Sequence, residues 1–143
     1  MVSSFTAGRD SLGERTLSNF DQYGIERRHV LQTSEAASGV ATILVAESGE
    51  NSIIIVPGAN LYLTGEHVKD AFPVVQSASV VLTQNEISPE TTLAALKSAS
   101  GSFSVWNAAP ALQPNHPLFE NLLKACSLVC VNETEAATMA VSH

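Results

Sequence analysis

Two β-branched runs near the middle of the chain give the clearest pattern of apolar and polar positions. They occupy residues 41–45 and 52–56, and the turn-prone tetrapeptide at residues 47–50 lies between them. Runs of this composition favour extended strands, and a short polar segment containing glycine favours a reversal of the chain. The pattern therefore predicts an antiparallel β-hairpin.

The sequence after Ser79 follows a different order, in which each short apolar run precedes a stretch with helical periodicity. The apolar runs are residues 80–83, 103–106 and 128–131. The expected helices begin after Ser88, span about residues 118–124, and begin after Asn132. Strands that alternate with helices are typical of a parallel sheet with right-handed crossovers.

Helices are also predicted on either side of the hairpin. Ser11 to Glu14 has the form of a capping box, and the following apolar spacing predicts a helix from Leu12 to Tyr23. Thr64 can cap a second helix, which Pro73 should kink or interrupt.

Composition narrows the functional classes. The chain has 143 residues, of which 45% are hydrophobic, with 7 basic and 14 acidic residues for a formal charge of −7. This size suits one domain with a core, and the absence of a basic cluster argues against nucleic acid or an anionic membrane as a partner. The apolar runs are far shorter than the roughly 20 residues that span a bilayer.

Compartment and metal chemistry follow from equally simple features. Residues 1–5 lack a basic segment followed by a long apolar one, so we expect no secretory signal and a cytoplasmic protein. Cys126 and Cys130 are the two cysteines, and without a second pair of ligands we expect both to be reduced and buried, with no zinc site.

Polar residues follow each of the three late strands. They form the segments Gln84-Asn85-Glu86, Asn107 to Ala111, and Asn132 to Glu135. The last has the spacing of a capping box, with Asn132 as the cap and Glu135 bonding back to it. Open α/β sheets bind ligands at the carboxyl ends of their strands, so these segments are candidates for a binding site.

Five segments, in this order and spacing, resemble ribokinases of the PfkB carbohydrate kinase family. Gly8 to Gly13 resembles the family's G-x-D-x-[FL]-G, and residues 33–60 resemble a lid hairpin that ends in G-A-N. The three later segments resemble Q-x-E, N-P-A-P-A and N-x-x-E. Ala108 replaces the usual proline, and Asn85 stands where an apolar residue is commoner. The match covers nearly the whole chain but less than half of a family member.

The resemblance implies an α/β fold: a partial ribokinase-like fold, in which a parallel sheet with flanking helices carries an antiparallel β-hairpin lid. We expect a single partial domain over residues 1–143, with the lid inserted at about 33–60. The activity implied is ATP-dependent phosphorylation of D-ribose, or a related pentose, to D-ribose 5-phosphate with Mg²⁺.

The resemblance also implies roles for three side chains. Glu86 would bind the sugar, Asn132 would contact the nucleotide phosphates, and Glu135 would act on magnesium through water. On the residues alone, Glu86 reads as an ordinary loop acid, and the other two read as a helix cap. Ile43 and Asn60 are interpreted as packing and turn residues.

No residue of this chain matches the family's catalytic aspartate. The Gly-Ala-Gly-Asp segment that carries it, the Gly-Gly loop that holds the sugar, and the residues that contact adenine and the monovalent cation have no counterpart here. We therefore expect the chain alone to be inactive. The alternative is a truncated, non-catalytic module that acts through lid-mediated protein association, including a homodimer. An unrelated doubly wound nucleotide-binding domain is a third interpretation, which the hairpin argues against.

Overall fold

The structure, a computed structural model, describes Met1 and residues 5–140. The expectation about a secretory signal therefore falls partly outside the described residues. The chain divides into two compact units, Met1–Leu63 and Thr64–His143, which are treated separately below. Among the described residues, no helix is long and apolar enough to cross a membrane.

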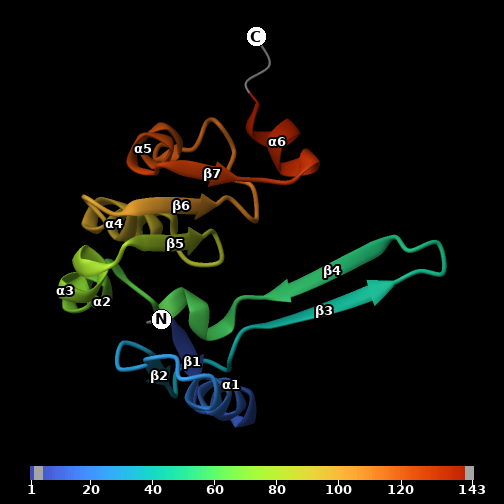
Figure 1. Ribbon diagram of the computed structural model, residues 1–143. Coiled ribbons are helices and arrows are strands. Elements are labelled where there is room, and N and C mark those ends of the chain that lie inside the picture. The colour runs from blue at the N-terminus through green and yellow to red at the C-terminus, as the bar shows by residue number, and fades with distance from the viewer. Residues whose placement is uncertain (2–4, 141–143) are drawn as a thin grey trace. The chain divides into compact units, whose positions relative to one another are not determined.

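The first unit combines a small parallel strand pair, one helix and a long hairpin (Figure 1). Its elements are β1 (Thr6–Gly8), α1 (Ser11–Gln22), β2 (Leu31–Thr33), β3 (Val40–Val45), β4 (Asn51–Val56) and the 3₁₀ helix η1 (Gly58–Tyr62). Strands β1 and β2 pair in parallel, and the sequence pattern did not predict either of them. The expected helix is present, but its cap is Asp10 and not Ser11, because the Asp10 carboxylate accepts a hydrogen bond from the Gly13 amide.

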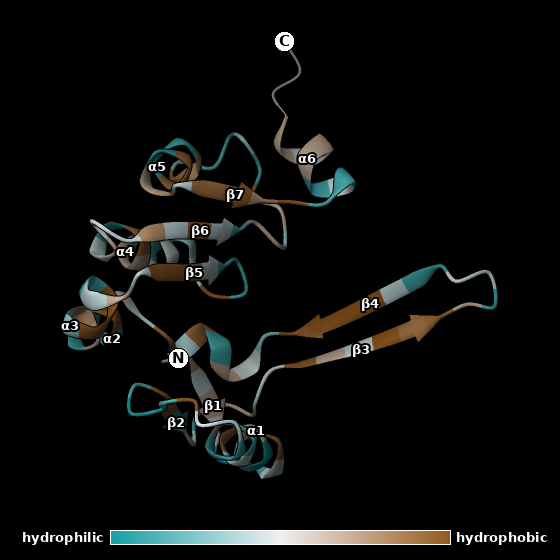
Figure 2. Ribbon diagram, in the orientation of Figure 1, coloured by the Kyte–Doolittle hydropathy of each residue, from teal (hydrophilic) through white to brown (hydrophobic). Residues whose placement is uncertain are grey.

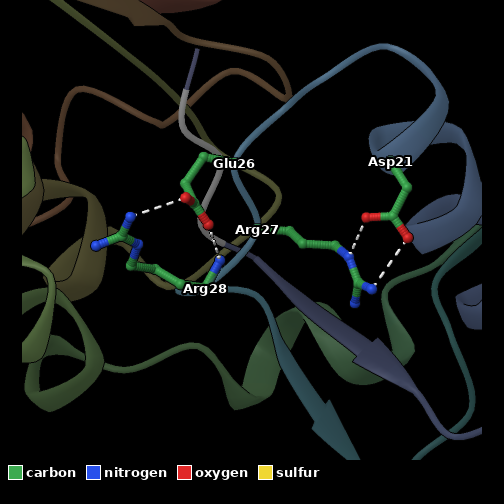
Figure 3. A network of polar contacts seen from close by, with 4 residues as sticks. All are labelled: Asp21, Glu26, Arg27 and Arg28. Carbon is green, nitrogen blue, oxygen red and sulfur yellow. Dashed lines mark hydrogen bonds and ion pairs between the residues drawn. The ribbon is translucent and has the colours of Figure 1, made fainter.

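Exposed ion pairs lie in the connection from α1 to β2 (Figure 3). The Arg27 guanidinium donates two hydrogen bonds to Asp21, and Arg28 donates to Glu26 from both its side chain and its amide. The Arg28 side chain is the main reason that the pKa of Glu26 falls to about 2. Because all four side chains face solvent, the pairs fix the local conformation more than they stabilise the fold.

The predicted hairpin is confirmed. Strands β3 and β4 pair antiparallel from Val40 opposite Val56 to Val45 opposite Asn51, and they form a sheet of their own. The hairpin extends beyond the rest of the first unit, and both of its strands are mostly hydrophobic in Figure 2. Every residue of both strands is exposed. Alternation along a strand divides these side chains between two faces, so both faces of the hairpin are apolar and uncovered.

The second unit contains the predicted strand and helix succession. Its elements are α2 (Gly65–Asp70), α3 (Phe72–Ser77), β5 (Val80–Gln84), α4 (Pro89–Ser98), β6 (Phe103–Asn107), α5 (Phe119–Ala125), β7 (Leu128–Cys130) and α6 (Glu133–Met139). The three strands are parallel in the order β5-β6-β7, as predicted. The helix after Thr64 is interrupted at Ala71, two residues before Pro73, as its sequence indicated.

The core of the second unit lies on one face of this sheet. Leu93 and Leu96 of α4 and Leu122 of α5 pack with Trp106 and Ala108, which are fully buried. The other face of the sheet is apolar and open within this unit. It carries Val80, Leu82, Phe103 and Leu128, each between 45% and 70% exposed.

The two cysteines differ from the expectation of burial. Cys126 is partly exposed and Cys130 is exposed. Cys130 is two residues after Leu128 in β7 and so shares the open face of the sheet with it, whereas Cys126 is the residue that ends α5. Partial burial raises the pKa of the Cys126 thiol.

Candidate functional site at the carboxyl edge of the sheet

The register of the three parallel strands brings the polar segments to one edge of the sheet. Gln84 lies opposite Asn107, and Asn107 lies opposite Cys130. Adjacent strands are about 4.8 Å apart, so the outer two strand ends are separated by roughly 10 Å. Glu86 follows the first of these ends by two residues, and Asn132 follows the last by two. The predicted convergence of the segments is therefore confirmed for the strands that carry them.

Glu86 lies in the middle of a short connection whose two ends are fixed. At one end, the buried Thr92 hydroxyl donates to the Gln84 carbonyl at 3.0 Å. At the other, Ser88 caps α4 by accepting from the Thr91 amide at 3.2 Å. The Glu86 side chain is exposed, and it forms no hydrogen bond or ion pair with another of the described residues. Its carboxylate is free to accept hydrogen bonds from two hydroxyl groups of a ligand.

Asn85 joins this connection to the segment after β6. Its Oδ1 accepts from the Trp106 indole Nε1 at 2.9 Å, and its Nδ2 donates to the Pro110 carbonyl at 2.9 Å. The backbone amide of Asn85 also donates to the Ala109 carbonyl at 3.1 Å. From the sequence, Asn85 was only a departure from the family pattern, where an apolar residue is commoner. Its role was missed because its partners are more than 20 residues away and only the folded chain places them beside it.

Asn132 and Glu135 form the predicted capping box at the start of α6. The Glu135 amide donates to Asn132 Oδ1 at 2.8 Å, and the Asn132 amide donates to Glu135 Oε2 at 2.9 Å. Asn132 is exposed and Glu135 is half-buried. The capping box uses one oxygen of each side chain. The side-chain NH₂ group of Asn132 and the second carboxylate oxygen of Glu135 can therefore still bind a ligand.

Glu135 is the residue of this edge that the sequence assigned to magnesium, through water. Among the described residues, no three His, Cys, Asp or Glu side chains are placed to hold a metal ion together. One carboxylate oxygen of Glu135 is instead suited to a hydrogen bond from a water bound to magnesium, since Mg²⁺ commonly keeps several of its waters in proteins. The free oxygen of Glu135 is compatible with the water-mediated role expected from the sequence, which stays a prediction.

The charge at this edge is negative. The residues that follow β5 and β7 include Glu86, Glu90, Glu133 and Glu135, and neither connection contains a lysine or arginine. Carboxylates repel a polyphosphate, and a divalent cation bound together with a nucleotide would offset that repulsion.

Asp10, interpreted from the sequence as a capping or solvated acid, anchors the base of the hairpin in the first unit. It accepts from the Ser38 amide at 2.7 Å, from the Ser38 hydroxyl at 2.8 Å and from Gly13 at 2.8 Å. These bonds, the Ser38 amide first, lower the pKa of Asp10. Gly8 packs against the same group, because a Cβ on Gly8 would lie 2.4 Å from the Ser38 nitrogen. The Gly-x-Asp spacing thus marks the attachment of the lid.

Comparison with known proteins identifies the family. The sequence matches the pfkB family carbohydrate kinase over residues 2–143, and the chain belongs to that family. It is 42% identical over 131 residues to the ribokinase of Mus musculus, which covers 90% of this chain and 40% of the mouse protein.

Solved structures of ribokinases have the same fold as this chain. The ribokinase of Giardia lamblia is similar with a TM-score of 0.82 at 34% identity, over 95% of this chain and 43% of that one. The ribokinase of Cryptococcus neoformans in complex with ADP has a TM-score of 0.79 at 28% identity, over 95% of this chain and 42% of that one. The fold is ribokinase-like, and the chain spans about 40% of the length of the relatives it matches.

Proposed function

We propose that this chain is part of an ATP-dependent ribose kinase, in which it supplies one sugar contact and the contacts near the nucleotide phosphates. The observation that carries the proposal is the alignment of Gln84, Asn107 and Cys130 at one edge of the sheet. That alignment places Glu86 and Asn132 at the same edge in a chain 42% identical to a ribokinase.

Glu86 is the proposed sugar contact. Its carboxylate is exposed, lies on a short and fixed connection, and can accept from two neighbouring hydroxyls. D-Ribose is the proposed substrate and its 5-hydroxyl the proposed acceptor, because the mouse and Giardia relatives are ribokinases. The product would be D-ribose 5-phosphate.

Asn132 and Glu135 are the proposed contacts on the nucleotide side. The side-chain NH₂ group of Asn132 can donate to phosphate oxygens, and the free oxygen of the Glu135 carboxylate can accept a hydrogen bond from a water bound to magnesium. The ADP bound to the Cryptococcus relative supports a nucleotide as the second substrate. Magnesium, when bound, would offset the charge of the phosphates beside the carboxylates of this edge.

No residue of the 143 is assigned as the catalytic base. A base is needed to take the proton of the attacking hydroxyl, and the sequence contains no Gly-Ala-Gly-Asp segment. We propose that the chain phosphorylates ribose only when the remaining part of the fold is supplied, in the same polypeptide or by another one.

The test is to join this chain to the parts of the mouse ribokinase that lie outside the matched region and to assay ATP-dependent phosphorylation of ribose, fructose and adenosine. Activity on ribose above the other two supports the proposal. A well-folded joined protein that prefers fructose or adenosine, or that phosphorylates none of the three, contradicts it.

Association through the hairpin is the second candidate function. It is favoured by the exposure of large side chains on both hairpin faces, including Ile43 at 57% and Ile54 at 59%. Two-stranded hairpins with uncovered apolar faces are marginal alone, and burial against a second copy would remove these faces from water. A homodimer formed by two hairpins is the proposed assembly, and its test is given in the Discussion.

A further inference from the structure

We propose that Asn85 is a positioning residue. Its hydrogen bonds to Trp106 and to the Ala109 and Pro110 carbonyls hold the backbone on which the Glu86 side chain is carried, and so fix where that side chain points. The role of Glu86 as a sugar contact rests on the function proposed above. The positioning of the connection by Asn85 is a separate claim about the chain itself and can be measured without a ligand.

The hydrogen bonds of Asn85 leave little freedom to the residue that follows it. Its side-chain oxygen, side-chain nitrogen and backbone amide each bind a partner in or after β6, at 2.9, 2.9 and 3.1 Å. Glu86 is the next residue, and only Ile87 separates it from the Ser88 cap. With Gln84 held by Thr92, the peptide on both sides of Glu86 is fixed by bonds that the Glu86 side chain does not make.

Trp106 is the fixed point of this arrangement. It is fully buried in the core between α4 and α5, so its ring cannot turn to follow a moving loop. A buried indole N–H needs an acceptor, and Asn85 Oδ1 is the one it has. An apolar side chain at position 85 would leave that N–H without a partner, and the connection would have to shift to admit water.

Asn85 and Trp106 therefore form a matched pair. Removing one member leaves a polar group unpaired, whereas replacing both by apolar residues of similar shape removes donor and acceptor together. In this chain the neighbouring strand carries the tryptophan whose N–H requires the Asn85 oxygen. The prediction is that positions 85 and 106 must change together for Glu86 to keep its direction.

The test uses the 143-residue chain labelled with ¹⁵N, because its one tryptophan gives a single indole N–H resonance. The variants are Asn85→Leu, Asn85→Asp, the double variant Asn85→Leu with Trp106→Phe, and Glu86→Gln. Two quantities are measured without ligand: hydrogen exchange of the amide at position 85, and exchange of the Leu122 amide in α5, which reports the core. Binding of D-ribose is then followed by the shift of the amide at position 86.

If Asn85 and Trp106 form such a pair, substitution of Asn85 should disturb the connection around Glu86 and leave the core of the second unit unchanged. Asn85→Leu should speed exchange at position 85 at least 10-fold while the Leu122 amide changes less than 3-fold, and should weaken the ribose response at least 5-fold. Asn85→Asp keeps an oxygen acceptor and should keep the indole resonance near its original position. The double variant removes the indole donor together with its acceptor, so position 85 should exchange more slowly in it than in Asn85→Leu, although the bond to the Pro110 carbonyl is still lost. Glu86→Gln should lose the ribose response and leave both exchange rates and the indole resonance unchanged.

Two results overturn the inference. Unchanged exchange at position 85 in Asn85→Leu shows that Asn85 fixes nothing, and an equal rise at position 85 and Leu122 shows a general loss of stability. If the wild-type chain alone shows no ribose response, the titration is repeated on the joined protein, and no response there shows that the proposed sugar contact fails. The exchange rates and the double variant then still decide whether Asn85 positions the connection.

Discussion

The Asp10 carboxylate accepts two hydrogen bonds from Ser38, which lies 28 residues further along the chain. Asp10 precedes α1, and Ser38 lies two residues before β3, so the contact joins the start of the helix to the base of the hairpin. Ser38 also accepts from the Gly8 amide at 3.0 Å with its hydroxyl. One small polar cluster thus fixes β1, α1 and the lid together in the first unit.

Ser38→Ala should destabilise the first unit. The change removes the hydroxyl that bonds both Asp10 and the Gly8 amide, and partly buried hydrogen bonds of this kind contribute about 0.5–1.5 kcal/mol each, so the free energy of unfolding should fall by about 1–3 kcal/mol. Urea unfolding followed by circular dichroism measures it. Ser34→Ala, at an exposed serine nearby, is the matched control and should change stability little. Equal effects of the two variants would contradict the role given to Ser38.

The stability added by Asp10 should depend on pH in a defined direction. Its folded pKa lies below the ordinary value of 3.8, because the charged form accepts the Ser38 and Gly13 bonds. The contribution is therefore fully present above the unfolded pKa and is lost as the pH falls from about 3.8 through the lower folded pKa.

Thermal unfolding of wild type and Asp10→Asn from pH 7 to pH 2 tests this sign. The difference in Tm should be largest near neutral pH and should shrink below about pH 3.8. Glu26→Gln serves as a comparison, since the pKa of Glu26 falls from 4.5 to about 2 on folding, and any difference it makes should be lost as the pH falls through that range. A difference for Asp10→Asn that stays constant over the whole range would show that its charge is not involved.

The regular elements could be predicted from sequence because their signals are local. The β-branched runs of the hairpin and the apolar runs after Ser79 each lie within a few residues, and the structure confirms both the antiparallel and the parallel pairing. Strands β1 and β2 could not be recognised in this way, since each has three residues and its pairing depends on a partner 25 residues away.

For the candidate site, too, local motifs were predicted from the sequence and contacts between distant residues were not. The capping box of Asn132 and Glu135 is a local motif, and it is present as expected. The bonds that join Asp10 to Ser38 and Asn85 to Trp106 were not predicted, because each connects residues more than 20 positions apart in the sequence. The exposure of Cys130 was also not predicted, since it depends on which face of the sheet the helices cover.

Glu135→Gln should separate the capping role of this residue from its proposed role toward magnesium. The amide oxygen of glutamine can still accept from the Asn132 amide, so the helix cap should persist and Tm should change by less than about 2 °C. Loss of the charge should raise the Mg²⁺ concentration needed for half-maximal activity of the joined enzyme several-fold. An unchanged Mg²⁺ requirement would assign Glu135 to the helix cap alone.

The hairpin should make the chain self-associate. Sedimentation velocity of the wild-type chain over a range of concentrations should show a monomer and dimer in equilibrium, because both hairpin faces are apolar and exposed. Ile43→Lys combined with Ile54→Lys places one charge on each face and should weaken association at least 10-fold. Ser48→Lys, at the exposed turn, is the control and should leave it unchanged. A monomer at all concentrations would contradict association through the hairpin.

The most direct test of the central claim is the specificity constant of the joined enzyme for each substrate. Glu86→Ala should lower kcat/KM for ribose by about 30- to 150-fold, equivalent to about 2 to 3 kcal/mol for a lost charged hydrogen-bond acceptor, and should change kcat/KM for ATP much less at saturating ribose. The 143-residue chain alone should show no ribose phosphorylation above background. Robust kinase activity from the chain alone, or an equal loss for both substrates in Glu86→Ala, would contradict the assignment of this edge of the sheet to the sugar and the nucleotide.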